Sequence, residues 1–328
     1  MKKCPNCTSL MPNDVTRCIR CGFDAKPTDT PVADALVAPN EKVGRQGRFA
    51  TGWTLATQSF RVLMLDKSLL VFPMLSGIAS FFVLASFLGG LFAVSHPGPG
   101  HKLMVNDSTA WILTFVFYFA SYFVIVYFNC ALVACAMVRF RGGTPTLAEG
   151  LRAARERTGQ IVAWALFAAT VGLVLRMIAE RVGFIGRIVI ALIGAAWTVA
   201  TYFVVPVLVE EDVGPFDALK HSSEIIKETW GESLVSNVGI GLVTTLVTAL
   251  ALAPVGLLTW MAVAKMGSVG LAITGGVLAL LIVVVAALVS SALSSIVLSA
   301  SYLYATEGKV PRVFADAGLQ YAFAPKKK

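Results

Sequence analysis

Charged side chains are scarce in this sequence, and the motifs of several enzyme classes are missing from it. Charged residues make up 14% of the 328 residues, against roughly 25% in a typical soluble domain, while apolar residues make up 56%. The chain has three histidines, no HExxH motif and no glycine-rich phosphate loop that ends in Lys-Ser or Lys-Thr. These absences exclude the HExxH zinc hydrolases and the P-loop nucleotide hydrolases, and we expect no enzymatic activity.

Six stretches lack Asp, Glu, Lys and Arg altogether. They are 68–101, 108–138, 158–175, 188–209, 233–264 and 266–306. Each reaches the roughly 18 residues that a helix needs to cross a bilayer. The alternative, buried helices of one large soluble core, fits poorly because soluble folds rarely contain so many such stretches. The predicted fold class is therefore an all-α polytopic membrane protein with six transmembrane helices.

The loops between these stretches differ in their content of Lys and Arg. With six spans, both termini lie on one side of the membrane. That side receives 22 of the Lys and Arg residues, and the other side receives five. The positive-inside rule therefore predicts a multi-pass protein of the plasma (inner) membrane with both termini in the cytoplasm. The net charge of +8 indicates attraction to anionic lipids of the bilayer rather than nucleic-acid binding.

Four cysteines near the N-terminus have the spacing of a metal site. Cys4, Cys7, Cys18 and Cys21 form two CxxC pairs separated by ten residues, which suits one tetrahedral Zn²⁺. The run CPNC…CIRCG resembles the zinc ribbons found at the N-termini of many bacterial membrane proteins. Rubredoxin-like iron, disulfides and free thiols are the alternatives. Because four thiolates leave no open position, residues 1–26 are predicted to be a zinc ribbon with a structural ion.

The ribbon is predicted to be an interaction module that contacts a protein partner, with nucleic-acid binding as the less favoured alternative. Residues 27–47 are rich in Pro and Gly and predict a flexible linker. The membrane domain follows over 48–323, and 324–328 form a basic tail. The membrane domain opens with apolar residues at helical spacing, which predicts an amphipathic helix in the membrane interface. These residues are Phe49, Trp53, Ala56, Phe60 and Leu63.

The segment Tyr202–Glu232 indicates an internal repeat. It leaves one apolar stretch, turns at Gly214-Pro215, continues as a short amphipathic helix and leads into the next apolar stretch. Similar arrangements of Gly, Pro and amphipathic helix follow the second and sixth apolar stretches. We predict three parallel repeats, roughly 49–138, 145–209 and 215–305, each a surface helix followed by two spans. A fourth surface helix closes the chain, and all four are predicted to lie on the cytoplasmic face.

Polar residues that could carry function fall in two places. Glu210, Glu211 and Asp212 end the fourth stretch, where carboxylates could serve acid-base chemistry or bind a divalent cation. Without a converging partner in the sequence, we expect a solvated boundary. His221, with Ser222, is also specific to this joint.

Asn129 and Asn237 lie within spans, as do Thr244 and Thr245, and all are uncharged. We expect hydrogen bonds between helices there, with a polar path across the membrane as the alternative.

The last stretch carries a ladder of small residues. Ala287, Ser291, Ser295 and Ser299 recur at four-residue spacing, which allows close approach of another helix. We predict a packing seam within the chain, with an interface between copies in a homo-oligomer as the alternative. Cys130 and Cys135, in the second stretch, are predicted to be small packing residues.

Two segments carry a family resemblance. They read RFATGWTLATQSFRVLMLDKSLLVFPMLSG and TYFVVPVLVEEDVGPFDALKHSSEIIKETWGESLVSNVGIG. They resemble a prokaryotic family of six-span integral membrane proteins in which FVVPVL leads to a Gly-Pro turn, an Ala-Leu-Lys-x-Ser helix and a Thr-Trp-Gly-Glu segment. The resemblance covers about 45–320 and implies the six-span fold but no activity. More distantly, the chain is similar to Yip-like membrane domains and to the membrane domain of some glycerophosphodiester phosphodiesterases.

The expected function is that of a non-enzymatic membrane scaffold or membrane-organising protein with a cytoplasmic zinc-ribbon module. A transporter or channel with a polar path between the repeats is the alternative, and a lipid-processing enzyme is a distant third. The absence of charge in the middle of the spans favours the scaffold over an ion-coupled transporter. A continuous water-accessible cavity lined by Asn129, Asn237 and Thr244 would contradict the scaffold.

Overall fold

The computed structural model of the chain describes residues 2–3, 10–11, 36–38, 48–97, 103–104, 106–228, 233–266 and 269–315. The helices are α1 (Arg48–Leu65), α2 (Val71–Val94), α3 (Asp107–Phe140), α4 (Leu147–Glu156), α5 (Thr158–Arg181), α6 (Phe184–Ala200), α7 (Val204–Glu210), α8 (Pro215–Glu228), α9 (Ser233–Met266) and α10 (Val269–Glu307). Two short 3₁₀ helices are η1 (Lys67–Leu70) and η3 (Arg312–Phe314). The strands form three two-residue antiparallel pairs, β1 (Lys2–Lys3) with β2 (Leu10–Met11), β3 (Leu36–Val37) with β6 (Val310–Pro311), and β4 (His96–Pro97) with β5 (Leu103–Met104).

Six segments of the described chain are long and apolar enough to cross a bilayer. They are Lys67–Val94, Ser108–Phe140, Thr158–Arg181, Phe184–Glu210, Thr244–Met261 and Gly270–Glu307. The predicted set of six spanning helices is thereby confirmed, and the chain is a multi-pass membrane protein. The fourth span differs from the prediction because it is two helices, α6 and α7, separated by a turn at residues 201–203.

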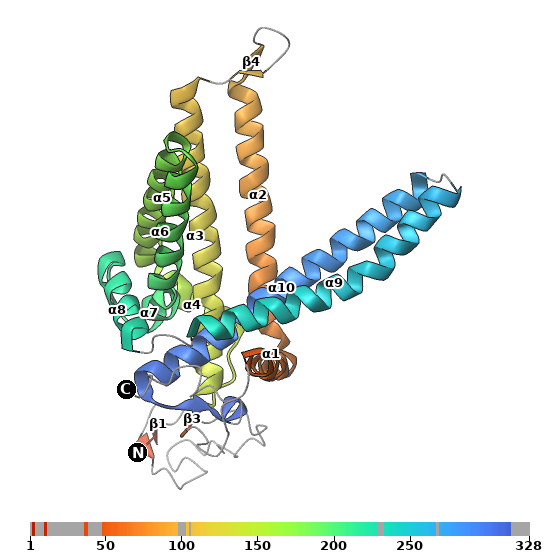
Figure 1. The fold of residues 1–328 in the computed structure, drawn as a ribbon. Helices are drawn as coiled ribbons and strands as arrows, with labels where there is room; N and C mark the ends of the chain where they lie inside the picture. The colour runs from red at the N-terminus through yellow and green to blue at the C-terminus, as the bar shows by residue number, and fades with distance from the viewer. Residues whose placement is uncertain are drawn as a thin grey trace.

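The spans are joined at one end and separate toward the other. In Figure 1, α2, α3, α5 and α6 run along one another, while the α9–α10 hairpin leans away from them. The buried core lies where they meet, and it is built from the second halves of α3 and α10 together with parts of α1, α5, α7 and α8. We call this region the convergent end. Away from it, large apolar side chains of the spans are exposed, as expected of surfaces that contact the bilayer.

Helix α3 ends in the glycine pair that the sequence suggested as a helix break. Gly142 has a φ of 85°, a backbone conformation that glycine adopts without strain. Its N–H donates to the Arg139 carbonyl at 3.1 Å, and the Gly143 N–H donates to the Val138 carbonyl at 2.9 Å. This pair of bonds is a Schellman motif, which satisfies the last carbonyls of the helix and turns the chain toward α4.

Helix α4 begins with a capping box and packs closely on α3. The Thr146 hydroxyl accepts from the Glu149 N–H at 3.3 Å, and the Glu149 carboxylate accepts from the Thr146 N–H at 2.8 Å. A Cβ added at Gly150 would lie 2.5 Å from the Cys135 Sγ and 2.9 Å from the Ala131 carbonyl oxygen. The side-chain-free position therefore permits this close approach. Cys135 and Cys130 are buried, in agreement with the prediction that they are packing residues.

Helix α1 is buried along one side and exposes aromatic residues on the other. Its buried positions are Leu55, Ala56, Ser59, Val62 and Leu63. Helix α1 contacts α9 and α10, whereas Trp53 is 51% exposed and Phe60 points away from the core. The helix has two apolar faces, one against the protein and one that carries Trp53 and Phe60 on the surface. The exposure of these two aromatic residues is what the predicted interfacial face requires, whereas Ala56 and Leu63 of that face belong to the buried side.

Helix α8 also packs against the protein rather than lying only on the membrane surface. Ala218, Ser222 and Ile226 are buried. Phe216 is 69% exposed, although its ring lies 4.9 Å from that of Phe167 in α5.

The order of elements follows the predicted units of a surface helix and two spans. The three units are nevertheless not alike, because α9 and α10 lean outward and the fourth span is broken. The segment predicted as a fourth surface helix is described only to residue 315, and this part contains η3. Within the predicted linker, Leu36 and Val37 pair with Pro311 and Val310. The symmetry of the repeats stays a prediction.

Candidate functional site

The acidic residues that follow the fourth span each reach a different part of the fold. Glu210 is the last residue of α7, and Glu211 and Asp212 continue into the loop before α8. Contrary to the expectation of a solvated boundary without partners, side chains from α3, α8, α10 and the start of α5 converge on them. We call these residues and their partners the polar cluster.

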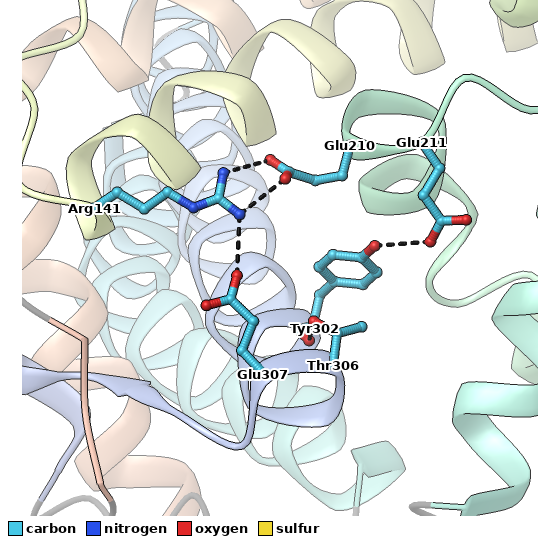
Figure 2. Close-up of polar contacts among 6 residues, drawn as sticks. All are labelled: Arg141, Glu210, Glu211, Tyr302, Thr306 and Glu307. Carbon is cyan, nitrogen blue, oxygen red and sulfur yellow. Dashed lines mark hydrogen bonds and ion pairs between the residues drawn. The ribbon is translucent and has the colours of Figure 1, made fainter. Parts of the chain in front are cut away.

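Arg141 joins the ends of three spans. It follows the last residue of α3, and its two terminal nitrogens donate to the two carboxylate oxygens of Glu210 at 2.9 and 2.8 Å. One of these nitrogens also donates to Glu307 Oε1 at 3.2 Å (Figure 2). The hydrogen bond to Glu210 is the main cause that raises the pKa of Arg141. The guanidinium is therefore a permanent cation between the ends of α7 and α10.

Glu211 connects α8 with α10. Its Oε2 lies 2.5 Å from Nδ1 of His221, and its Oε1 accepts from the Tyr302 hydroxyl at 3.0 Å (Figure 2). Tyr302 is almost completely buried, so its hydroxyl needs a partner and Glu211 provides one. His221, which the sequence singled out, is thus brought to the acidic residues.

Asp212 contacts the start of α5. Its Oδ1 accepts from Arg157 Nη1 at 2.5 Å and from Gln160 Nε2 at 2.6 Å. Asp212 is mostly exposed, whereas Arg157 is largely covered. These contacts extend the polar cluster from α10 to α5.

The geometry of the polar cluster suits attachment better than chemistry. Each carboxylate accepts from cationic, imidazole or hydroxyl donors of a neighbouring element, so each links two parts of the fold. A partly exposed ion pair contributes about 0–1 kcal/mol, and the bidentate Arg141–Glu210 contact belongs near the upper end. Among the described residues, no group of three or more His, Cys, Asp and Glu side chains could hold a metal ion.

A sequence model of one protein family matches residues 108–312, which include every residue of the polar cluster. The chain belongs to DUF6159, a family of unknown function. The match covers spans two to six and omits α1 and α2, so it is narrower than the resemblance seen in the sequence. None of the curated proteins compared with the chain matches it.

Within the part matched by the DUF6159 family, Ser222 of α8 forms hydrogen bonds with the backbone at the break in the fourth span. The Phe203 N–H donates to the Ser222 hydroxyl at 3.0 Å, and this hydroxyl donates to the Ala200 carbonyl at 2.6 Å. Pro206 explains the break, because a proline cannot donate to the carbonyl four residues earlier and its ring clashes with it. Ser222 is completely buried and satisfies backbone groups that would otherwise lie unpaired.

The polar residues within the membrane do not gather in one place. Asn129 is half-buried on α3, and the Asn237 side chain lies outside what the structure describes. Thr244 faces α10 and, with Thr245, Thr248 and Ser290, lines an open groove of about 380 Å³ between α9 and α10. Asn129 does not line this groove. The remaining lining of the groove is aliphatic.

The two halves of the small-residue ladder of α10 differ in burial. Ser295 and Ser299 are buried in the core, as an internal packing seam requires. Ala287 and Ser291 are exposed, and Ala287 lines the groove with Thr244. The packing interpretation is thus confirmed for the second half of the ladder and not for the first.

The proposed zinc ligands Cys4, Cys7, Cys18 and Cys21 lie outside the described residues. The zinc ribbon of this DUF6159 member therefore stays a prediction.

Sequence reasoning missed Arg141 and Tyr302, because their partners lie 69 and 91 positions away. It also passed over the capping box, although the Thr-x-x-Glu signal at 146–149 was present.

Proposed function

We propose that this protein is a non-enzymatic membrane scaffold. The observation that carries the proposal is the polar cluster centred on Arg141. It ties the ends of α3, α7 and α10 together at one side of the membrane and leaves the outer halves of the spans in contact with lipid. An assembly of this form holds surface helices in fixed positions at a membrane.

In this proposal, both termini lie in the cytoplasm. The N-terminal ribbon, with one structural zinc held by Cys4, Cys7, Cys18 and Cys21, recruits a protein partner to the membrane. The excess of Lys and Arg on the side of the termini supports this orientation. Pairing of β3 with β6 supports it further, because it holds the segment after the ribbon beside the end of α10.

Solute flux tests the scaffold directly. The purified protein is reconstituted in liposomes loaded with K⁺, Na⁺ or a small neutral solute, and efflux is compared with that from empty liposomes. A scaffold gives the same efflux in both. Efflux that rises with the amount of protein and saturates with solute concentration would show transport instead.

Metal analysis tests the ribbon independently of flux. The purified chain is expected to carry about one zinc, as four thiolates bind one tetrahedral ion. The double variant Cys4→Ser, Cys21→Ser should lose it. Full zinc content in that variant would refute the site and leave the membrane proposal unaffected.

A transporter is the second candidate, and one observation favours it. The groove between α9 and α10 brings Thr244, Thr245, Thr248 and Ser290 together in a membrane-spanning hairpin. If the groove carried a solute, Thr244→Val with Thr248→Val would reduce the efflux measured above. The matched control is Thr198→Val, since Thr198 bonds only to a carbonyl of its own helix in the described structure.

A further inference from the structure

A second groove lies between the end of α3 and α4. It encloses about 230 Å³. Ala134 and Val138 of α3 and Ala153 of α4 give it an apolar floor, and Glu149, Arg152 and Glu156 of α4 form its charged rim. The groove therefore has one apolar side and one charged side.

The position of the groove matches the boundary between acyl chains and headgroups. The second span ends at Phe140, two residues after Val138, which is 43% exposed. The α3 side of the floor thus belongs to the end of a membrane-spanning helix. Helix α4 packs back along these last turns, where its Gly150 lies against Cys135 and Ala131. The span has 33 residues, about 50 Å of helix, which exceeds the roughly 30 Å of a hydrocarbon core, so its end and the charged side chains of α4 beside it are placed at the level of the headgroups.

The rim carries one cation between two anions. Arg152 lies three residues after Glu149 and four residues before Glu156, and it is 72% exposed. Its Nε is 3.8 Å from Glu156 Oε1, which is too far for a good hydrogen bond. The Arg152 donors therefore remain available to a second acceptor.

Glu149 is held in place and stays ionised. Its carboxylate accepts from both the N–H and the hydroxyl of Thr146, and these bonds lower its pKa. A purely anionic headgroup would meet two carboxylates and one guanidinium, an unfavourable balance. A headgroup with both a phosphate and a cation fits the alternation of charges along the rim.

We propose that the α3–α4 groove binds a phospholipid whose headgroup carries a phosphate and a primary ammonium, as in phosphatidylethanolamine. The acyl chain lies on the floor at Ala134, Val138 and Ala153. Arg152 binds the phosphate, and Glu156 accepts from the ammonium. The site depends only on the membrane location of the chain and stands apart from the choice between scaffold and transporter.

Native mass spectrometry of the full chain tests the site. The protein is prepared in micelles that contain equal amounts of phosphatidylethanolamine, phosphatidylcholine and phosphatidylglycerol, and the bound lipid is identified. Arg152→Gln should lower phosphatidylethanolamine binding about tenfold, the effect of losing one charge-assisted contact. Arg155→Gln is the matched control. It removes the same charge from an exposed position of α4 outside the groove, and binding should change by less than about twofold.

Two further variants separate the headgroup from the acyl chain. Glu156→Gln should remove the preference for phosphatidylethanolamine over phosphatidylcholine, because the ammonium loses its acceptor. Ala153→Leu should reduce binding of all three lipids by filling the floor. Equal losses in Arg152→Gln and Arg155→Gln would overturn the site, as would a wild-type protein that binds the three lipids equally.

Discussion

The two halves of α10 belong to one membrane-spanning segment and have opposite surroundings. Its second half supplies Ala292, Ile296 and Leu303 to the buried core of the convergent end. Its first half pairs with α9 alone among the described spans and exposes Leu280 at 63% of its surface. Apolarity accounts for the membrane location of both halves. Side-chain packing and the polar cluster hold only the second half in place. We therefore infer that structural order is concentrated at the convergent end.

The largest expected difference comes from truncating a leucine in each half of α10. Leu303→Ala leaves a cavity in the core and should lower the free energy of unfolding by about 2–5 kcal/mol. Leu280→Ala removes a side chain that contacts lipid, so its effect should be far smaller. Unfolding in mixed micelles with a denaturing detergent measures both. Equal losses would mean that the hairpin is packed as tightly as the convergent end.

Replacing a glycine by alanine at the convergent end and in the first half of α10 also compares how tightly the two regions are packed. Gly150→Ala places a methyl group against Cys135, Phe72 and the Ala131 carbonyl, and overpacking should destabilise the protein by about 1–3 kcal/mol. Gly276→Ala on α10 meets nothing within 4 Å and should be neutral or slightly stabilising. Thermal unfolding of the two variants compares them. A neutral Gly150→Ala would contradict the close contact of α4 with α3.

Loss of the Ser222 hydroxyl should destabilise the protein somewhat less. Ser222→Ala leaves the Phe203 N–H and the Ala200 carbonyl unpaired beside the break in the fourth span, which should cost on the order of 1–2 kcal/mol. Ser223→Ala is the control, because the Ser223 hydroxyl bonds only within α8 among the described contacts. Hydrogen exchange at Phe203 should increase in the first variant and stay unchanged in the second.

Removal of Arg141 gives the smallest expected change. Arg141→Gln should lower the free energy of unfolding by about 1 kcal/mol, because it leaves Glu210 and Glu307 without their shared cation. Arg176→Gln removes an ion pair with Glu180 on its own helix and a long 3.4 Å contact with the Tyr118 hydroxyl of α3, and it should cost about 0.3–0.5 kcal/mol. The difference should shrink at high salt. An effect of Arg141→Gln no greater than that of Arg176→Gln would refute its role in joining the spans.

Local features of the fold could be predicted from the sequence. The absence of charge predicted the six spans. The pair Gly142-Gly143 is typical of a helix end, and the four-residue spacing of Arg176 and Glu180 is typical of an ion pair, which is present at 3.0 Å. Each of these depends on residues close together in the chain.

Features that depend on contacts between distant segments were not predictable in this way. Periodicity could not distinguish the face of α1 that meets α9 and α10 from the face that carries Trp53, since both are apolar. The acidic residues looked solvated because Arg141 and Tyr302 are distant in sequence. Only the packing of α3, α7 and α10 brings them together.

Water accessibility within the spans tests the central claim most directly. Single cysteines are introduced at Asn129, Asn237 and Thr244 in a variant whose native cysteines are replaced, and the protein is reconstituted in vesicles. A membrane-impermeant thiol reagent is then applied from each side in turn. The scaffold predicts that none of the three positions reacts from either side. Labelling of Thr244→Cys and Asn237→Cys from both sides would reveal a continuous water path and contradict it.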